Sequence, residues 1–142
     1  MSQPLHVEAR WQDGLSATVS ARDHQLVADE PEAFGGADAG MMPTELFLAG
    51  LTSCFCLAVA HVAAKRDIVL AGLRVTVDAE RVGTERRYSR LRVEVAAVAG
   101  EHDLEALVER AKPFCWVSNM LAGDLEVTYV PVVLDPPPAD AR

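Results

Sequence analysis

The sequence predicts an α+β fold with the element order β-β-β-α-β-β-α-β. Two observations indicate this order. Apolar and polar residues alternate in several short segments, which is the pattern of half-buried strands. Two longer segments instead carry apolar residues on all sides or at helical spacing. The chain has 142 residues, of which 50% are hydrophobic, so residues 1–142 are expected to form a single domain with one core.

Residues 1–30 predict an antiparallel sheet. The segments LHVEARW, LSATVSA and HQLVAD alternate between apolar and polar residues, and Asp13-Gly14 is a turn signal between the first two. Residues 31–43 predict a loop, because their prolines and glycines prevent regular structure over more than a few residues. Loops of this kind often border a functional site.

Residues 44–66 predict a long helix. Thr44 can cap it, and Glu45 lies in the first turn, where the helix dipole favours a carboxylate. The segment from Leu46 to Ala64 carries no charged residue, so a membrane span is an alternative, although its glycine, hydroxyl groups, His61 and many alanines make insertion weak. A helix that is apolar on all sides must be buried on all sides, which two chains packed together achieve more easily than one. We therefore expect a homodimer and no membrane contact.

The second half of the chain predicts a hairpin, a helix and a strand. Residues 70–99 show period two in LRVTVDAERV and SRLRVEVAAVA, which predicts the hairpin. Residues 101–122 carry apolar residues at near-helical spacing, and Pro113 should kink or divide this second helix because proline lacks an amide proton. Residues 124–134 predict the last strand, and 135–142 a frayed tail.

The charge balance excludes two classes of partner. The formal net charge is -8 and the isoelectric point is near 4.9, so no electrostatic attraction favours nucleic acid or an anionic membrane surface. Three cysteines are too few and too irregularly spaced for a disulfide framework, and the first residues lack the pattern of a secretion signal. We therefore expect a location in the reducing cytoplasm.

The three cysteines allow more than one interpretation. Cys54 and Cys56 point roughly 200° apart on a helix, so they cannot form a disulfide while the helix persists. A thiol buried without a cationic neighbour is inert, which makes simple packing one interpretation of each cysteine. Cys115 lies in another helix beside the break at Pro113, where free amides can stabilise a thiolate. Two thiols from separate helices can therefore meet in space.

A metal site is a rival interpretation of the same cysteines. A zinc site usually needs four ligands from loops, and the four histidines show no paired spacing, so we expect neither a metal nor another cofactor. His61 lies seven residues after Cys54 on the same helix face, roughly 10 Å along the axis. That separation is too large for a direct base, and we interpret His61 as a core or interface residue.

Two segments together resemble the OsmC/Ohr family over almost the whole chain. They are GGADAGMMPTELFLAGLTSCFC and AKPFCWVSNML, with a Pro-x-Glu-Leu helix start, a Ser-Cys-Phe, and a Cys-x-Val-Ser-x-x-Leu. The resemblance implies one OsmC-like domain with antiparallel sheets around two central helices. It also implies an intertwined homodimer with active sites at the subunit interface.

The resemblance further implies an activity in oxidative-stress defence, the thiol-dependent reduction of organic hydroperoxides. Cys54 would attack the O–O bond as a thiolate, release an alcohol and become a sulfenic acid. Cys115 would then condense with this sulfenic acid to give a disulfide. A dithiol reductant, such as a lipoyl-bearing protein or thioredoxin, would reopen it.

In the family, an arginine held by a glutamate lowers the pKa of the attacking thiol. The early arginine of the Ohr branch would fall near Gln12 in this chain, and its glutamate would fall at Thr44. The Pro-x-Glu-Leu pattern of other branches fits Glu45 better. Arg10 and Arg22 are the candidate substitutes for the arginine.

Glu45 also has a plain structural interpretation. Nine residues of continuous helix place it roughly 13 Å from Cys54, so it can act only through an arginine, a helix break at Gly50 or the other subunit. The alternative is a solvated first-turn acid that only stabilises the helix.

Several apolar side chains lie near the thiols in sequence and predict a pocket that prefers organic peroxides, unless most of them are ordinary core. They are Phe34, Met41, Met42, Phe47, Phe55, Phe114 and Trp116. Cys56 lies outside the family pattern and is interpreted as a packing residue. Two other functions stay open: a protein that binds an apolar ligand at the dimer interface, and a structural stress protein in which Cys54 and Cys115 never approach each other.

Overall fold

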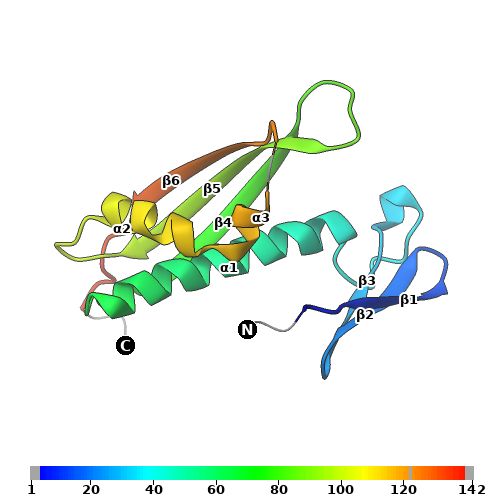
Figure 1. Ribbon diagram of the computed structural model, residues 1–142, viewed down its shortest axis with the longest axis horizontal. Coiled ribbons are helices and arrows are strands. Elements are labelled where there is room, and N and C mark those ends of the chain that lie inside the picture. Colours follow the sequence, from blue (N-terminus) through cyan, green and yellow to red (C-terminus); the bar gives the residue numbers. More distant parts are fainter. Residues whose placement is uncertain (1–3, 122, 140–142) are drawn as a thin grey trace. The chain divides into compact units, whose positions relative to one another are not determined.

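The computed structural model describes residues 4–121 and 123–139 and has the α+β fold that the sequence predicts (Figure 1). Contacts divide the chain into two compact units, one up to Ala49 and one from Gly50 onwards. The boundary lies inside the long helix α1, Pro43–Lys65. Each unit contains one three-stranded sheet.

The first unit contains an antiparallel sheet with the strand order β1-β2-β3. Its strands are β1, Glu8–Asp13, β2, Ser16–Ala21, and β3, His24–Ala28. Gly14 has a φ of 49° in the turn between β1 and β2, a conformation that glycine adopts without strain. The alternating segments of the sequence therefore form the sheet that they predict.

One buried carboxylate organises the loop between β3 and α1. Asp29 is 1% exposed. Its side chain accepts hydrogen bonds from the backbone amides of Glu30, Ala37 and Ala39 at 2.8, 3.3 and 3.1 Å. These bonds compensate for the burial of a charge. The segment expected as an irregular loop, 31–43, therefore follows a fixed course that includes the short 3-10 helix η1, Glu32–Phe34.

Hydrogen bonds to free backbone groups define both ends of α1. At the start, the Met42 amide donates to the Glu45 carboxylate at 2.9 Å, which is one half of a capping box. At the end, the Ile68 amide donates to the Ala63 carbonyl at 2.9 Å, as in a Schellman motif. The helix begins and ends within one residue of the expected range, 44–66.

Within one chain, α1 buries one face rather than all sides. The buried residues are Leu51, Phe55, Ala58, Val59, Val62 and Ala63. On another face, Leu57 is 70% exposed. By length and composition, α1 is apolar enough to cross a membrane, with a mean hydropathy of 2.0, but 33% of that stretch is buried. The core helices of soluble proteins pass the same test, so this is only a weak indication of a membrane span.

The second unit contains a mixed sheet with the strand order β4-β5-β6. Its strands are β4, Ala71–Arg81, β5, Tyr88–Val98, and β6, Glu126–Val133. β4 and β5 form the expected antiparallel hairpin, but β6 runs parallel to β5. This corrects the expectation of purely antiparallel sheets. The chain returns to the start of β5 through helices, and a helical crossover joins parallel strands.

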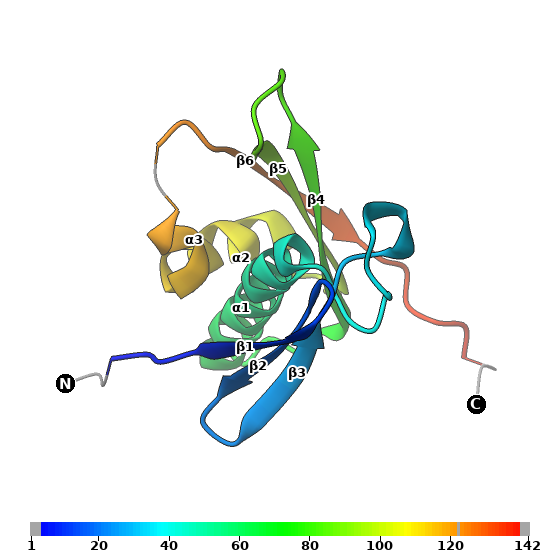
Figure 2. The ribbon, with the colours of Figure 1, turned by 90° about the vertical axis from the view of Figure 1, so that its right-hand side faces the viewer.

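The segment expected as one helix, 101–122, is divided into three. It forms α2, Leu104–Ala111, the 3-10 helix η2, Lys112–Phe114, and α3, Trp116–Met120. The division falls at Pro113, as its missing amide proton predicts. α2, α3 and the part of α1 in this unit lie on the same side of the sheet (Figures 1 and 2). The core lies between the helices and the sheet. Val93 and Val95 of β5 and Leu104 and Leu107 of α2 are at most 1% exposed.

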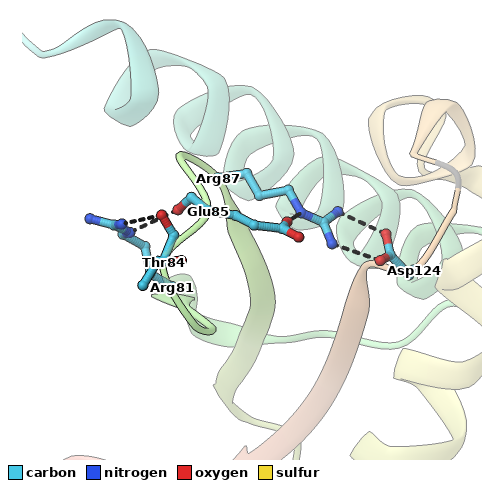
Figure 3. Close-up of polar contacts among 5 residues, drawn as sticks. All are labelled: Arg81, Thr84, Glu85, Arg87 and Asp124. Carbon is cyan, nitrogen blue, oxygen red and sulfur yellow. Dashed lines mark hydrogen bonds and ion pairs between the residues drawn. The ribbon is translucent and has the colours of Figure 1, made fainter.

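A cluster of ion pairs ties the β4–β5 hairpin to the chain just before β6 (Figure 3). Arg87 donates two hydrogen bonds to Asp124, at 2.7 and 2.6 Å, and one to Glu85. The guanidinium of Arg87 holds the pKa of Asp124 below its ordinary value. Because the pair is exposed to solvent, we expect it to contribute little stability.

Candidate functional site

The fold brings the thiols of Cys54 and Cys115 together. Cys54 lies in the middle of α1, and Cys115 lies at the junction between η2 and α3. The two thiols lie close enough that Cys54 raises the pKa of Cys115, and both cysteines are free. Cys115 is fully buried, whereas Cys54 is half-buried. Two thiols from separate helices therefore meet, with only one of them open to solvent.

The break at Pro113 puts Cys115 in this position. Cys115 has an extended backbone, with φ -87° and ψ 99°, so the chain changes direction between η2 and α3. Its amide donates to the Lys112 carbonyl at 3.2 Å, which closes η2. An uninterrupted helix would not make this turn at Cys115.

The surroundings of Cys115 favour its protonated form. Burial raises the pKa of the Cys115 thiol, the side chain and backbone of Ser118 lower it by hydrogen bonding, and the hydrogen bond and charge of Cys54 raise it. The net shift is upward from the ordinary value, so Cys115 is a thiol at neutral pH.

An apolar pocket of about 340 Å³ opens at Cys54. It is lined by Cys54, Leu57, Ala58, His61, Phe114 and Trp116. Trp116 is 78% exposed, which is unusual for a side chain of its size. The pocket can take an apolar molecule and bring it against the half-buried thiol.

The sequence-predicted pocket residues fall into three groups. Phe114 and Trp116 line the pocket beside Cys54. Phe55 instead lies in the core, where it is 0% exposed and its ring is 4.9 Å from that of Tyr129. It does not face the pocket because adjacent residues of a helix point about 100° apart, so Phe55 and Cys54 lie on different faces. Four others belong to the first unit and their part in the pocket stays a prediction: Phe34, Met41, Met42 and Phe47.

His61 lines the pocket at Cys54, although the sequence was interpreted as placing it in the core or at an interface. It is exposed rather than part of the core, and its ring lies 5.5 Å from that of Phe114. The spacing contained the signal, because residues four and seven positions after Cys54, Ala58 and His61, share its helix face. His61 is the titratable group that lines the pocket together with Cys54.

The candidate activating residues all lie in the first unit. Glu45 accepts the hydrogen bond that begins α1, which agrees with its structural interpretation. Arg10 is paired with Glu8 in β1, and Arg22 lies in the turn between β2 and β3 with a φ of 54°. Their action on Cys54 stays a prediction.

Cys56 is half-buried and does not line the pocket at Cys54. Within residues 4–121 and 123–139, no three His, Cys, Asp or Glu side chains are grouped so that they could hold a metal ion. The reactive groups of the described site are the thiols of Cys54 and Cys115 and the imidazole of His61.

Known proteins resemble this chain over the region that contains the two thiols. The family model described as OsmC-like protein matches residues 35–130, which include all three cysteines. An organic hydroperoxide resistance protein of Xanthomonas axonopodis pv. citri (strain 306) is 35% identical over 103 residues, which are 69% of this chain and 72% of that protein.

Solved structures share the fold. An organic hydroperoxide resistance protein OsmC from Legionella pneumophila is 27% identical, with a TM-score of 0.69 over 92% of this chain and 98% of that one. An OsmC-like protein from Mycoplasma pneumoniae has a TM-score of 0.79 over 95% of this chain and 100% of that one. At 18% identity, the second comparison carries only the fold.

Proposed function

Because this chain belongs to the OsmC-like protein family, we propose that it reduces organic hydroperoxides with the thiols of Cys54 and Cys115, in defence against oxidative stress. One observation carries the proposal: two free thiols from separate helices lie close enough to interact, and one of them, Cys54, lines an apolar pocket. The name of the Xanthomonas relative, organic hydroperoxide resistance protein, supports the same class of substrate.

The different exposures of the thiols support their roles. Cys54 lines the pocket and meets the peroxide, whereas Cys115 is fully buried and cannot meet it first. The Cys54 thiolate attacks one peroxide oxygen, the O–O bond breaks, and the alkoxide takes up a proton and leaves as an alcohol. Cys115 then attacks the sulfenic acid, the S–O bond breaks, and the oxygen leaves as water with the thiol proton.

The pocket lining supports a preference for organic over hydrogen peroxide. Leu57, Phe114 and Trp116 offer apolar surface that an alkyl or aryl group can cover. Hydrogen peroxide has no apolar part and gains nothing from this surface. The preference therefore arises from the pocket and not from the reacting sulfur.

Activation, assembly and re-reduction complete the proposal. A cation must stabilise the Cys54 thiolate, and Arg10 or Arg22, held by Glu45, takes this role in the assembled protein. The exposed face of α1 packs against a second copy to form a homodimer. A dithiol, such as a lipoyl protein or thioredoxin, reopens the disulfide in the cytoplasm.

The direct test is peroxide consumption by the purified protein with a dithiol. We expect the wild type to turn over cumene hydroperoxide, Cys54→Ser to lose all activity, and Cys115→Ser to react once and stop as a sulfenic acid. Cys56→Ser is the matched control and should keep its activity, because Cys56 does not line the pocket. A wild type that consumes no hydroperoxide with either lipoyl or thioredoxin dithiols would contradict the proposal.

The exposed pocket favours one alternative function, the binding of an apolar ligand without catalysis. Leu57 is 70% and Trp116 78% exposed, so a bound acyl chain would cover substantial apolar surface. Native mass spectrometry separates the two functions. A retained lipid together with an absence of peroxide turnover would favour binding, and turnover by a ligand-free protein would favour the peroxidase.

A further inference from the structure

The pocket at Cys54 contains a polar group that the proposed cycle has not used, the imidazole of His61. One side of this pocket consists of four residues of α1 at helical spacing: Cys54, Leu57, Ala58 and His61. Residues three, four and seven positions apart share one face of a helix. The thiol and the imidazole therefore belong to the same stripe of α1, and the stripe residues between them are apolar.

The thiol and the imidazole lie at opposite ends of this stripe. Seven residues of continuous helix separate Cys54 from His61, which is roughly 10 Å along the axis. Phe114 of η2 and Trp116 of α3 complete the lining of the pocket. A molecule that reaches from the thiol to the imidazole therefore crosses an apolar surface roughly 10 Å long.

His61 is accessible to a ligand in this pocket. Its side chain is exposed, and its ring is 5.5 Å from that of Phe114 at an interplanar angle of 53°. Among the residues that the structure describes, the imidazole has this ring contact but no hydrogen bond or ion pair. A histidine ring donates at least one N–H hydrogen bond in either of its charge states. A hydrogen-bond donor therefore stands at the end of the pocket away from the thiol.

The charges along α1 favour an anionic acceptor for this donor. Lys65, four residues after His61, is exposed, and side chains at this spacing are neighbours on a helix. No Asp or Glu occurs between Leu46 and Ala64, and the next acidic residue, Asp67, lies beyond the end of α1. A carboxylate beside His61 would meet a donor and a neighbouring cation, and no acidic side chain of the same helix would repel it.

We propose that His61 determines substrate preference by binding a carboxylate that the hydroperoxide carries roughly 10 Å from its O–O bond, while Cys54 reacts at the other end. At about 1.2 Å of extension per bond, a chain of about eight carbons covers this separation. The chain would cover apolar surface of Leu57, Phe114 and Trp116. The inference rests on the proposed peroxidase function and specifies its substrate class.

The test compares two hydroperoxides that differ only in charge. The first is a straight chain of about eight carbons with a hydroperoxide at one end and a carboxylate at the other, and the second is its methyl ester. With the wild type, we expect KM for the acid to be about fivefold lower than KM for the ester, which is the gain from a partly exposed charged contact. His61→Leu should abolish this difference. His61→Lys, which supplies a cation, should keep it, and His61→Glu should reverse it.

Two controls separate recognition in the pocket from general attraction of anions. His102→Leu removes an exposed imidazole that does not line the pocket, and this variant should keep the wild-type preference. An acid with half the chain length cannot reach from the thiol to the imidazole, so the wild type should not prefer it over its ester. Each comparison uses both substrates on the same protein, so impaired folding does not imitate a change in the ratio of KM values.

Protection of Cys54 from alkylation gives a second readout that needs no turnover. Octanoate should slow the reaction of Cys54 with iodoacetamide, followed by peptide mass mapping, more than methyl octanoate does, in the wild type but not in His61→Leu. A wild type that consumes neither hydroperoxide overturns the proposed function, and protection by octanoate then still tests the contact with His61. A wild type with equal KM for acid and ester, or a His61→Leu variant that keeps the preference, overturns only the role of His61.

Discussion

At the residue scale, two chemically identical side chains lie in unlike surroundings. Cys54 meets solvent and an apolar pocket, whereas Cys115 is 0% exposed and touches Cys54 and Ser118. Burial disfavours a thiolate, so a buried thiol is suited to wait in its protonated form until its partner has been oxidised. The fold therefore supports an order of reaction and not only a meeting of sulfurs.

The raised pKa of Cys115 predicts how stability depends on pH. A thiol whose pKa is higher in the folded state stabilises the fold fully below its unfolded pKa, about 8.5, and this contribution is lost as pH rises through the folded pKa. We expect urea unfolding of the reduced protein to show falling stability above this pH. Cys115→Ser should flatten the decline, and an equally steep decline in that variant would mean that another group causes it.

The exposed indole of Trp116 predicts a substrate effect. Trp116→Ala removes apolar surface from the pocket, so KM for cumene hydroperoxide should rise about tenfold while the rate with hydrogen peroxide stays nearly the same. Steady-state kinetics with both peroxides measures the difference. Val69→Ala, which truncates a side chain that is 85% exposed and does not line the pocket, serves as the control. An equal loss with both peroxides would argue against a binding role.

Sequence reasoning reached the site residues unevenly. The motifs around Cys54 and Cys115 predicted which thiols to pair, because the family pattern fixes their helices. The packing of Tyr129 against Phe55 was beyond reach, because it depends on how β6 lies in the sheet and no local pattern encodes that. Phe55 was assigned to the pocket by its closeness in sequence, although one step along a helix turns a side chain to another face.

At the element scale, the ends of helices and strands could be predicted where nearby residues determine them. Glycine and alternation signals marked the strands, and Pro113 marked the division between α2 and α3. The parallel pairing of β5 with β6 is a long-range choice, which residue alternation leaves open because both directions share period two. The fixed course of the loop after β3 was also missed, since it depends on the burial of Asp29.

Two glycine substitutions test this view of the loop. A Cβ on Gly36 would lie 1.8 Å from the Glu30 carbonyl oxygen, whereas one on Gly50 in α1 would meet nothing within 4 Å. We expect Gly36→Ala to lower the free energy of unfolding by about 3 kcal/mol, because the backbone must shift. Gly50→Ala should raise it by about 0.5–1 kcal/mol through helix propensity. Denaturant unfolding measures both, and a tolerated Gly36→Ala would mean that the loop is not fixed.

At the scale of the whole molecule, we propose that the exposed apolar face of α1 is explained by the association of two chains. The helix buries one face in its own chain, yet Leu57, Ala60 and Ala64 are exposed beside one another at helical spacing. A long apolar helix that exposes a leucine and two alanines on one face is costly in water, and the alanines allow close approach of a second helix. This is the physical reason for the homodimer that we propose.

Ala60 provides the decisive test of that assembly, because it lies on the open face of α1 but does not line the pocket at Cys54. In sedimentation or light-scattering measurements, the wild type should have twice the chain mass of 15.3 kDa. Ala60→Glu should give the single-chain mass, because a carboxylate cannot be buried there without a partner. Val69→Glu places the same charge on an exposed residue outside the helix and should leave the mass unchanged. If Ala60→Glu keeps the double mass, the copies associate through another surface. If the wild type itself has the single-chain mass, the open face of α1 is exposed to water and the proposed homodimer is wrong.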